Sequence, residues 1–338
     1  MLAGQPALIV TAMKNEGPYI LEWVAHHMAL GFDNFIVMTN DCDDGTDRIL
    51  DRLQQLIPLQ HVPNPKSLFG DRSNWQVMAH RYASLFNLYK DAGWIYFTDV
   101  DEFLQIWVGD GTLDCFHQAA GGFDVVSFTS MPFGSNGVIT LDDLPVVTQF
   151  TVQSKHYGAD KAEGRRPNNA IKTMFHNRIH FSVRRNHRPR RSDFSQLGMR
   201  WIDGSGQAFS DAWVDGKAKD IAPEGSIDLA QFNHYAIRSA EAYLVKIDRG
   251  DVAGVPRLDA ERSIGYWRIY DEKGDIDTRA ALPRPGAVKL RDQFLTDPIL
   301  GELHAAALAH HRKRAAALRA REDYASVLAA MGLAAGVT

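Results

Sequence analysis

The chain has 338 residues, of which 45% are hydrophobic and 23% charged, an ordinary globular composition that suffices for one large α/β domain with additions or for two domains. The 37 basic and 41 acidic residues give a net charge of −4, so no basic excess indicates nucleic acid binding. Two cysteines imply no disulfide framework and favour a reducing cytoplasm. We expect neither a signal peptide nor a membrane span.

The first third of the sequence alternates apolar runs typical of buried strands with stretches of helical spacing. Strands are predicted over 6–13 and 34–41 and from residue 94, and helices over 17–31, 44–56 and 72–93. Gly31 is the expected C-cap of the first helix, and Asp44 or Thr46 the N-cap of the second. This order predicts a right-handed, mostly parallel sheet, whose ligands bind beyond the carboxyl ends of the strands.

The pattern becomes mixed after residue 105. A strand and a glycine-rich loop are predicted over 123–137, and short strand-like runs alternate with loops over 151–235. Short helices are predicted over 240–249 and 260–270, and one or two helices over 291–334.

Three acids follow a buried strand within the stretch WIYFTDVDEFL, residues 94–104. Asp99, Asp101 and Glu102 stand where like charges repel and desolvation is costly. A divalent cation such as Mg²⁺ or Mn²⁺ would offset the repulsion, since both prefer carboxylate oxygens shared with phosphate. The alternative is that the acids cap the next helix or pair with arginines.

Three further motifs accompany this strand end. In chain order, with the strand end in second place, the four are KNEGPYILEWVAHHMALGFDNFIVMTNDCDDGT (14–46), GWIYFTDVDEFL (93–104), PFGSNG (132–137) and FNHYAIRSAEAYLVKIDRGDV (232–252). Together they resemble the GT-A glycosyltransferases, and more narrowly the family 2-like and family 92-like branch. The resemblance implies a GT-A type, Rossmann-like, mixed but mostly parallel sheet with flanking helices and a helical C-terminal segment.

The resemblance also implies a division of the chain. A glycosyltransferase domain would cover 1–285, with a nucleotide-binding half over 1–105 and an acceptor half over 106–285. A helical extension would cover 286–338. The implied reaction is metal-dependent transfer of a sugar, with inversion, from a nucleotide-diphosphate sugar to a glycan or other hydroxyl acceptor in polysaccharide or glycoconjugate synthesis.

The metal implied by the resemblance is Mn²⁺ or Mg²⁺. Asp99 and Asp101 would bind it, and His234 from the distal half would be the third ligand. His187 competes for that third place. His234 has a plainer interpretation as a satisfied core or surface histidine.

Donor contacts are implied for residues at the strand ends and for basic residues that would stabilise the leaving diphosphate. These are Thr11, Asn15, Glu16, Asp41, Asp99, Lys172, Lys246 and Arg249. Asp41 has an alternative as a turn or helix cap. The arginine-rich stretch RRNHRPRR (184–191) is expected to contact the donor phosphate or an anionic acceptor, rather than nucleic acid or solvent alone.

A general base is needed beside the acceptor hydroxyl. No Glu-Asp pair of the kind usual in family 2 occurs in the later sequence. Asp203, Asp211 and His187 are the candidates, and no spacing distinguishes them.

Two other functions compete with sugar transfer. A nucleotidyltransferase would share the sheet and the metal carboxylates, but TAMKNEG (11–17) lacks the glycine-rich loop expected after its first strand. A non-catalytic nucleotide- or carbohydrate-binding module would retain the fold, and Asp99, Asp101 and His234 argue against it.

The C-terminal stretch over 300–332 has high helix propensity, an alanine-leucine stripe and many basic residues. One interpretation is a basic amphipathic helix that makes peripheral contact with an anionic membrane. The other is a helix that packs on its own domain or on a partner subunit. We expect packing, because the stripe is mostly alanine without Trp or Phe and would bury little area in lipid.

Overall fold

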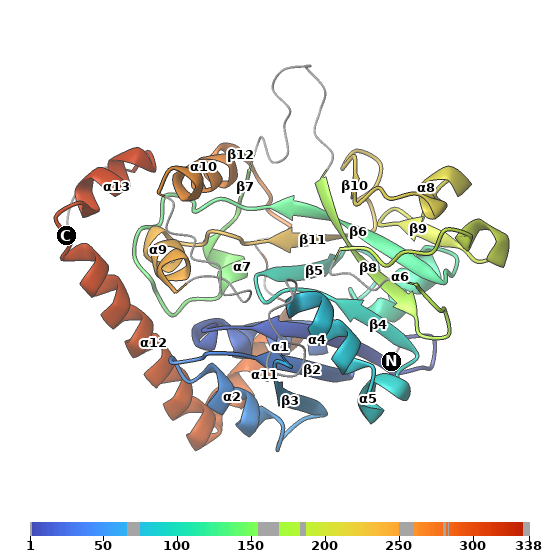
Figure 1. Ribbon diagram of the computed structural model, residues 1–338, viewed down its shortest axis with the longest axis horizontal. Helices are drawn as coiled ribbons and strands as arrows, with labels where there is room; N and C mark the ends of the chain where they lie inside the picture. Colours follow the sequence, from blue (N-terminus) through green and yellow to red (C-terminus); the bar gives the residue numbers. More distant parts are fainter. Residues whose placement is uncertain are drawn as a thin grey trace.

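The amino-terminal strands form the parallel part of a large mixed sheet (Figure 1). The computed structural model describes residues 2–65, 75–154, 169–182, 187–249, 260–279, 282 and 284–333. In it β1 (Ala7–Met13) lies between β2 (Asn34–Thr39) and β4 (Trp94–Phe97), with β3 (Leu59–Pro63) outside β2, and all three pairings are parallel. Since β1 is buried along its whole length, its sequence is a continuous apolar run.

The rest of the sheet is mixed. β8 (Asn169–His176) runs antiparallel to both β4 and β6 (Val125–Pro132), β11 (Ala230–His234) is parallel to β6, and β5 (Glu102–Ile106) pairs antiparallel with β11. Two short strands branch from this path, β9 (Trp201–Asp203) on β6 and β10 (Asp220–Ile221) on β8. β7 (Val152–Ser154) and β12 (Lys273–Ile276) form a separate pair. The predicted mixed, mostly parallel α/β fold is confirmed.

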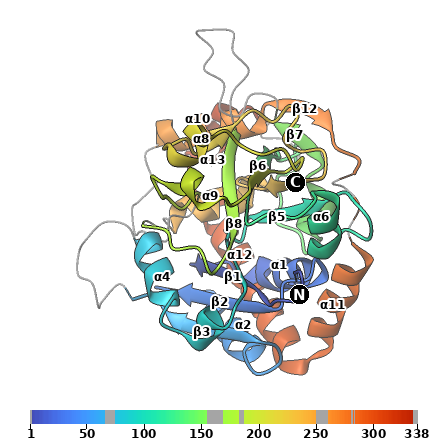
Figure 2. The ribbon, with the colours of Figure 1, turned by 90° about the vertical axis from the view of Figure 1, so that its right-hand side faces the viewer.

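Helices cover both faces of the parallel strands, as Figure 2 shows with α1 and α11 on one side and α4 on the other. β1 sends alternate side chains to two cores, since Ile9 packs with residues of α1 whereas Leu8 and Val10 pack with residues of α4. The first helices are η1 (Gly17–Tyr19), α1 (Ile20–Ala29), α2 (Thr46–Leu53), α4 (Trp75–Ala83), α5 (Asn87–Lys90) and α6 (Leu113–Ala119). The later ones are α7 (Val146–Gln149), η2 (Phe194–Leu197), α8 (Asp211–Asp215), α9 (Ala240–Asp248), α10 (Ala260–Asp271), α11 (Pro285–Thr296), α12 (Pro298–Arg319) and α13 (Tyr324–Ala330).

The single long helix predicted over 72–93 is wrong, apart from residues 72–74, which lie outside the described residues. The helix ends at Ala83 and a second, α5, begins at Asn87. The Ser84 hydroxyl donates to the Arg81 carbonyl, and Phe86 adopts an extended conformation with ψ of 150°. Such a local side-chain bond competes with helix continuation.

Other details of the first half also differ from the sequence prediction. β3 was not predicted, because it is a short outer strand with only one buried residue, Leu59. Gly45 is the N-cap of α2, and the Asp44 carboxylate accepts the backbone N–H of Thr46.

The C-terminal segment forms three helices rather than one or two. α12 runs along the left edge of Figure 1 and packs on α9, α2, η1 and α11. Its alanine-leucine stripe is buried, with Leu300, Ala307 and Ala315 almost fully enclosed. The predicted packing of this stripe on its own chain is confirmed. None of the described helices is both long and apolar enough to span a membrane.

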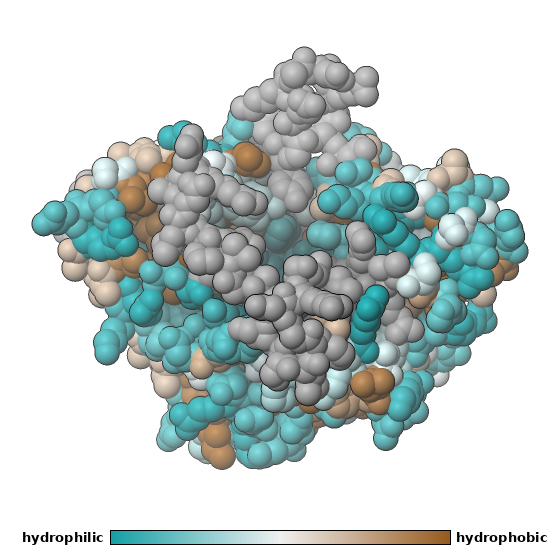
Figure 3. Space-filling view, viewed as in Figure 1, coloured by the Kyte–Doolittle hydropathy of each residue, from teal (hydrophilic) through white to brown (hydrophobic). Residues whose placement is uncertain are grey.

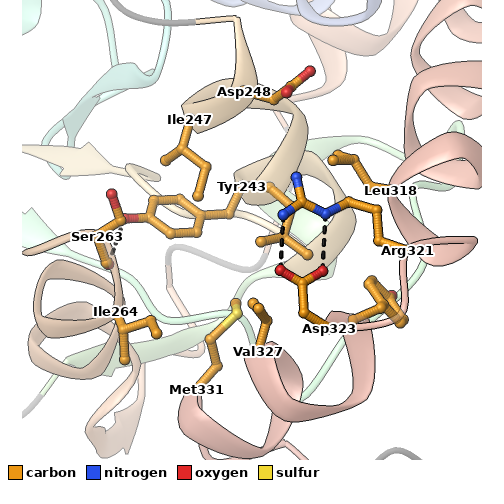
Figure 4. Close-up of a pocket in the computed structure, with 12 residues that line it drawn as sticks. Tyr243, Ile247, Asp248, Ser263, Ile264, Leu318, Arg321, Asp323, Val327 and Met331 are labelled. Atoms are coloured by element: carbon orange, nitrogen blue, oxygen red, sulfur yellow. Dashed lines mark hydrogen bonds and ion pairs between the residues drawn. The ribbon is translucent and has the colours of Figure 1, made fainter. Parts of the chain in front are cut away.

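A third apolar core joins α13 to α9 and α10. The space-filling view shows apolar side chains gathered between these helices on the left of the face (Figure 3). A cavity of about 120 Å³ remains among them, bordered by Tyr243, Ile264, Val327 and Met331, with the Arg321–Asp323 ion pair beside it (Figure 4). The Tyr243 hydroxyl donates to the Ser263 carbonyl 2.8 Å away, which ties α9 to α10.

Gly17, the first residue of η1, lies close against α12. A Cβ added at Gly17 would lie 2.6 Å from the Ala307 Cβ and 3.1 Å from an Asp44 carboxylate oxygen. Gly17→Ala is therefore expected to destabilise the protein by about 1–3 kcal/mol, as overpacking does. Chemical unfolding measures this, and Ala307→Gly should restore part of the loss.

Gly265, inside α10, is the matched control because its added Cβ would meet open space. Gly265→Ala should stabilise the protein by up to about 1 kcal/mol through helix propensity. If Gly17→Ala were as stable as the parent, the described contact between η1 and α12 would be wrong.

Glu22 gives the stability a pH dependence. Its carboxylate accepts the N–H groups of Val146, at 2.8 Å, and Val147, at 3.3 Å, and burial raises its pKa from 4.5 to about 7. The folded chain thus holds this proton more tightly than the unfolded chain, so Glu22 lowers the free energy of unfolding as pH rises from 4.5 to 7. Glu22→Gln should remove this loss of stability. The melting temperature of the variant minus that of the parent should therefore increase as the pH rises from 4.5 to 7. Glu302→Gln, an exposed change on α12, should track the parent at every pH. A constant offset between Glu22→Gln and the parent from pH 4 to 8 would refute the prediction.

Candidate active site

The acidic turn between β4 and β5 is held by a dense set of hydrogen bonds. Glu102 accepts the Thr98 hydroxyl and the Asp99 N–H, both at 3.0 Å, through one carboxylate oxygen. The Trp23 indole N–H reaches the carbonyls of Asp99, at 3.1 Å, and Glu102, at 3.0 Å, from α1. The turn is thereby held both by its own side chains and by α1, which packs against it.

Lys172 on β8 neutralises two of the three acids. Its ammonium lies 2.7 Å from Asp99 and 2.9 Å from Glu102, and its side chain is 0% exposed. Burial alone would lower the pKa of Lys172, but the two carboxylates outweigh burial and hold it above its usual value. A buried lysine therefore offsets the repulsion between two acids at this strand end. Pairing with arginines was the alternative to a metal expected from the sequence, and the structure shows such a pairing with lysine in place of arginine.

Asp101 has its own cation and a histidine neighbour. Lys246 of α9 donates to one carboxylate oxygen at 2.6 Å, and the Nε2 of His234 lies 3.8 Å from the other. The Tyr270 hydroxyl is 3.4 Å from the Nδ1 of His234, so Nε2 is the nitrogen turned to Asp101. Burial alone would raise the pKa of Asp101, but Lys246 and His234 hold it well below its usual value.

Glu16, just beyond β1, is clasped by two guanidinium groups. Arg238 lies 3.1 Å from one carboxylate oxygen, and Arg249 donates to the other. Burial would raise the pKa of Glu16, but Arg249 and Arg238 together keep it below its usual value. The Arg238 guanidinium also stacks 3.6 Å above the Tyr19 ring. Glu16 is therefore an ion that orients two arginines.

The ends of β1 and β2 carry strained backbone. Asn15 and Asp41 both have φ of 51°, in the left-handed region that side-chain-bearing residues rarely adopt. Asn15 and Asp43 bond each other, and both border a cavity together with Asp41. Thr11 lies deeper in β1, where its buried hydroxyl has no hydrogen-bond partner among the described residues.

The three candidate bases are scattered. Asp203 accepts the N–H groups of Ser205 and Gln207 in a turn, and burial raises its pKa. Asp203 pairs with Ser127 on β6, whereas His234 pairs with Pro132 on the same strand. These two positions on β6 are five residues apart, which is about 16 Å at the usual rise of a strand. Asp211 is exposed at the start of α8, on the side of Figure 1 opposite to α9. The structure therefore brings neither aspartate to the end of β11.

His187 lies close to Lys172 instead. Its Nδ1 is 3.2 Å from the Ile171 carbonyl, and burial and Lys172 lower its pKa to about 4, which leaves the ring neutral near pH 7.

The arginine-rich stretch is largely structural where the structure describes it, and residues 184–186 lie outside the described residues. Arg188 is buried, donates to carbonyls of Trp213, Val214 and Ala218, and lies 4.0 Å from the Trp213 ring. It thus closes the end of α8. Arg191 pairs with Asp193.

Sequence reasoning missed several residues that complete this arrangement. Arg238 lies within the motif over 232–252. No local sequence pattern indicates its φ of 53° or its bond to Glu16. Tyr270 and the α12 residues His310, His311 and Arg314 come from segments that carry no motif. Polar residues on one face of α12 were the only available signal.

Among the described residues, no group of three or more Asp, Glu, His or Cys side chains is arranged to hold a metal ion. The predicted trio is only partly assembled, because Asp99 bonds Lys172 whereas Asp101 and His234 face each other. A carboxylate oxygen and an imidazole nitrogen are suitable ligands for Mn²⁺, and the second nitrogen of His234 is anchored as metal-binding histidines usually are. The Asp101–His234 pair could therefore supply two ligands to a divalent cation, and the remaining ligands would have to come from outside the described residues.

The glycosyltransferase family 92 model matches residues 13–195, more than half of the chain. No match to this chain was found among curated proteins. A mycobacterial protein crystal structure is 16% identical, with a TM-score of 0.26, over 40% of this chain and 43% of that one. The crystal structure of S. aureus TarS 1–349 is 12% identical, with a TM-score of 0.32, over 93% and 91% of the two chains.

The crystal structure of the longer S. aureus TarS is also 12% identical, with a TM-score of 0.31, and this chain spans about half of its length, 49%. No fold or function is assigned from likenesses this distant. The segment matched by the family model contains β2, β4, the acidic turn and Lys172. The resemblance expected from the sequence is confirmed: the chain belongs to glycosyltransferase family 92.

Proposed function

We propose that this glycosyltransferase moves a sugar from a nucleoside diphosphate sugar to a hydroxyl group of a glycan or similar acceptor, with the help of Mn²⁺ or Mg²⁺ and with inversion. The proposal includes the transferase class EC 2.4 and a role in polysaccharide or glycoconjugate synthesis. It also includes a cytoplasmic location, which the free thiols of Cys42 and Cys115 favour.

The observation that carries this proposal is the set of cations already oriented around the acidic turn. Lys246 lies in the last turn of α9, and Arg249, three residues later, is the C-cap, so both lie on the same side of the helix end. Lys246 points to Asp101, and Arg249 points to Glu16. A diphosphate leaving group that develops negative charge beside them would be stabilised without rearrangement of the protein.

Asp101 and His234 are the residues that would hold the cation. When bound, Mn²⁺ or Mg²⁺ would neutralise diphosphate charge as a Lewis acid. Lys246 holds one Asp101 oxygen and leaves the other turned toward His234, while Tyr270 orients the ring. Lys172 holds Asp99 at the neighbouring position, so Asp99 is oriented to accept a hydroxyl of the donor.

Inversion requires one displacement at the sugar carbon. The acceptor oxygen attacks from the face opposite the leaving diphosphate, and its proton passes to a base. No enzymic nucleophile is needed for this course, and the cation-rich end of α9 supports the leaving group. The anomeric configuration of the product, read by NMR, tests this part of the proposal.

Asp101→Asn should abolish Mn²⁺-dependent binding of a nucleoside diphosphate while the fold stays intact. The amide would weaken the ligand to the cation and would leave Lys246 without a carboxylate partner. Calorimetric titration of UDP, GDP and CDP in the presence of Mn²⁺ measures this, with thermal unfolding as the check of the fold. Asp91→Asn, at an exposed position after α5, is the matched control and should bind as the parent does. Equal affinity of Asp101→Asn and the parent for the nucleoside diphosphate in Mn²⁺ would refute the metal assignment.

His234→Ala should lower metal-dependent turnover far more than His187→Ala. His234 faces Asp101, whereas His187 bonds a backbone carbonyl. Loss of a ligand should weaken the apparent Mn²⁺ affinity by more than the ~10–100-fold that loss of a ligand's outer partner costs. The donor is first found by screening the parent against a panel of nucleotide sugars with and without Mn²⁺, and Mn²⁺ is then titrated for each variant. The reverse order of effects would mean that the third ligand is misassigned.

A further inference from the structure

A polar cavity of about 130 Å³ lies beyond the ends of β1 and β2, and α12 forms one of its walls. This is roughly ten times the ~10–15 Å³ that one water molecule needs, so the cavity can hold a sizeable polar group. The strand ends contribute Lys14, Asn15, Asp41 and Asp43, α9 contributes Val245 and Arg249, and α12 contributes His310, His311 and Arg314.

Two of the residues that border this cavity have an uncommon backbone conformation. Asn15 and Asp41 both have φ of 51°, and each lies two residues beyond the end of its strand, β1 or β2. Residues in this left-handed region often occur at binding sites. Lys14 adds an ammonium that, within the described part of the chain, donates to the Arg249 carbonyl and pairs with no carboxylate.

α12 is fixed to this region by a buried hydrogen bond. The Nε2 of His311 lies 2.9 Å from Asp44, and the two side chains are 4% and 0% exposed. The same carboxylate accepts the N–H groups of Gly17 and Thr46, each at 2.9 Å. Asp44 follows Asp41 and Asp43 directly in the chain, so His311 holds the turn that carries both of them.

Two neighbours of His311 on α12 reach the cavity. The Nε2 of His310 is 3.7 Å from Asp43, and its side chain is 32% exposed. Arg314, one turn further along, pairs with Asp248 and keeps 48% of its side chain exposed. An exposed surface pair of this kind contributes little, so the guanidinium is available to a ligand at small cost. Both side chains can donate hydrogen bonds and stack on a planar ring.

α9 links the cavity to the acidic turn, because it contributes residues to both. Lys246 contacts Asp101, and Arg249, three residues later, borders the cavity. A ligand that occupies both places therefore has an anionic end at Asp101 and Lys246 and a polar, planar end beneath α12. A nucleoside diphosphate has this shape.

We propose that α12 is a wall of the active site, in which His310 and Arg314 contact the nucleoside of the donor and set its affinity, while His311 is a positioning residue that acts through Asp44. This inference rests on the proposed function and deepens it, because it adds the C-terminal helix to the donor site.

The test compares the full chain with the double variant His310→Ala/Arg314→Ala by calorimetry in Mn²⁺. The probes are UDP, GDP, CDP and inorganic diphosphate. We expect the double variant to bind the preferred nucleoside diphosphate at least tenfold more weakly, and inorganic diphosphate within twofold of the parent. Lys313→Ala, on the exposed face of α12, removes one charge away from the cavity and should leave both affinities unchanged.

His311→Ala and His311→Gln test the positioning role. The alanine variant should lose nucleoside diphosphate affinity selectively, and glutamine, whose amide can donate to Asp44, should restore part of it. Retained binding of inorganic diphosphate is the check that each variant is folded.

Each failure has a distinct meaning. If the parent binds none of the three nucleoside diphosphates, the proposed function fails and this inference falls with it. If the parent binds one and the double variant binds it equally well, the role of α12 is refuted and the proposed function stands. Equal losses for inorganic diphosphate and nucleoside diphosphate would also refute the inference, because α12 would then act on the whole site and not on the nucleoside.

Discussion

The pairing of the strand-end carboxylates with cations from distant segments is the interaction on which this structure depends. Glu16, Asp99, Asp101 and Glu102 are gathered at one end of the sheet, and Arg238, Arg249, Lys172 and Lys246 neutralise them. A buried charge left alone costs several kcal/mol, a large part of the stability of an ordinary domain. The segments that carry the acids are therefore more stable when they pack together with the segments that carry the bases.

The partners come from distant parts of the chain, and this links the fold to the chemistry. Lys172 lies 73 residues after Asp99, and Lys246 lies 145 residues after Asp101. β8 and α9 must be in place before the acidic turn is stable, so the second half of the sheet and the charge balance of the site form together. The result is a site whose cations are held in position in advance, which is the arrangement that favours charge development at low cost.

Local signals predicted the strands and the acids, but they could not predict the partners. β1, β2 and β4 are continuous apolar runs, and each ends in polar residues, so both features are visible in the sequence. The Arg238–Glu16 bond depends on a positive φ and on the course of the chain after β11. Helix propensity likewise predicted α12 but not the surface on which it packs, and the break at Ser84 depends on a side-chain bond that competes with the helix. Interactions between distant segments therefore account for most of what was missed.

The bond between His311 and Asp44 has a consequence for how the protein is made. The two residues are 267 positions apart. At the usual speed of translation, about 5–20 residues per second, roughly 15–50 s pass between the synthesis of Asp44 and that of His311. During this interval the turn after β2 lacks one of its supports, while β1 and β2 are already available to pair. A nascent chain can thus complete its parallel strands well before the ribosome supplies the helix that closes the neighbouring cavity.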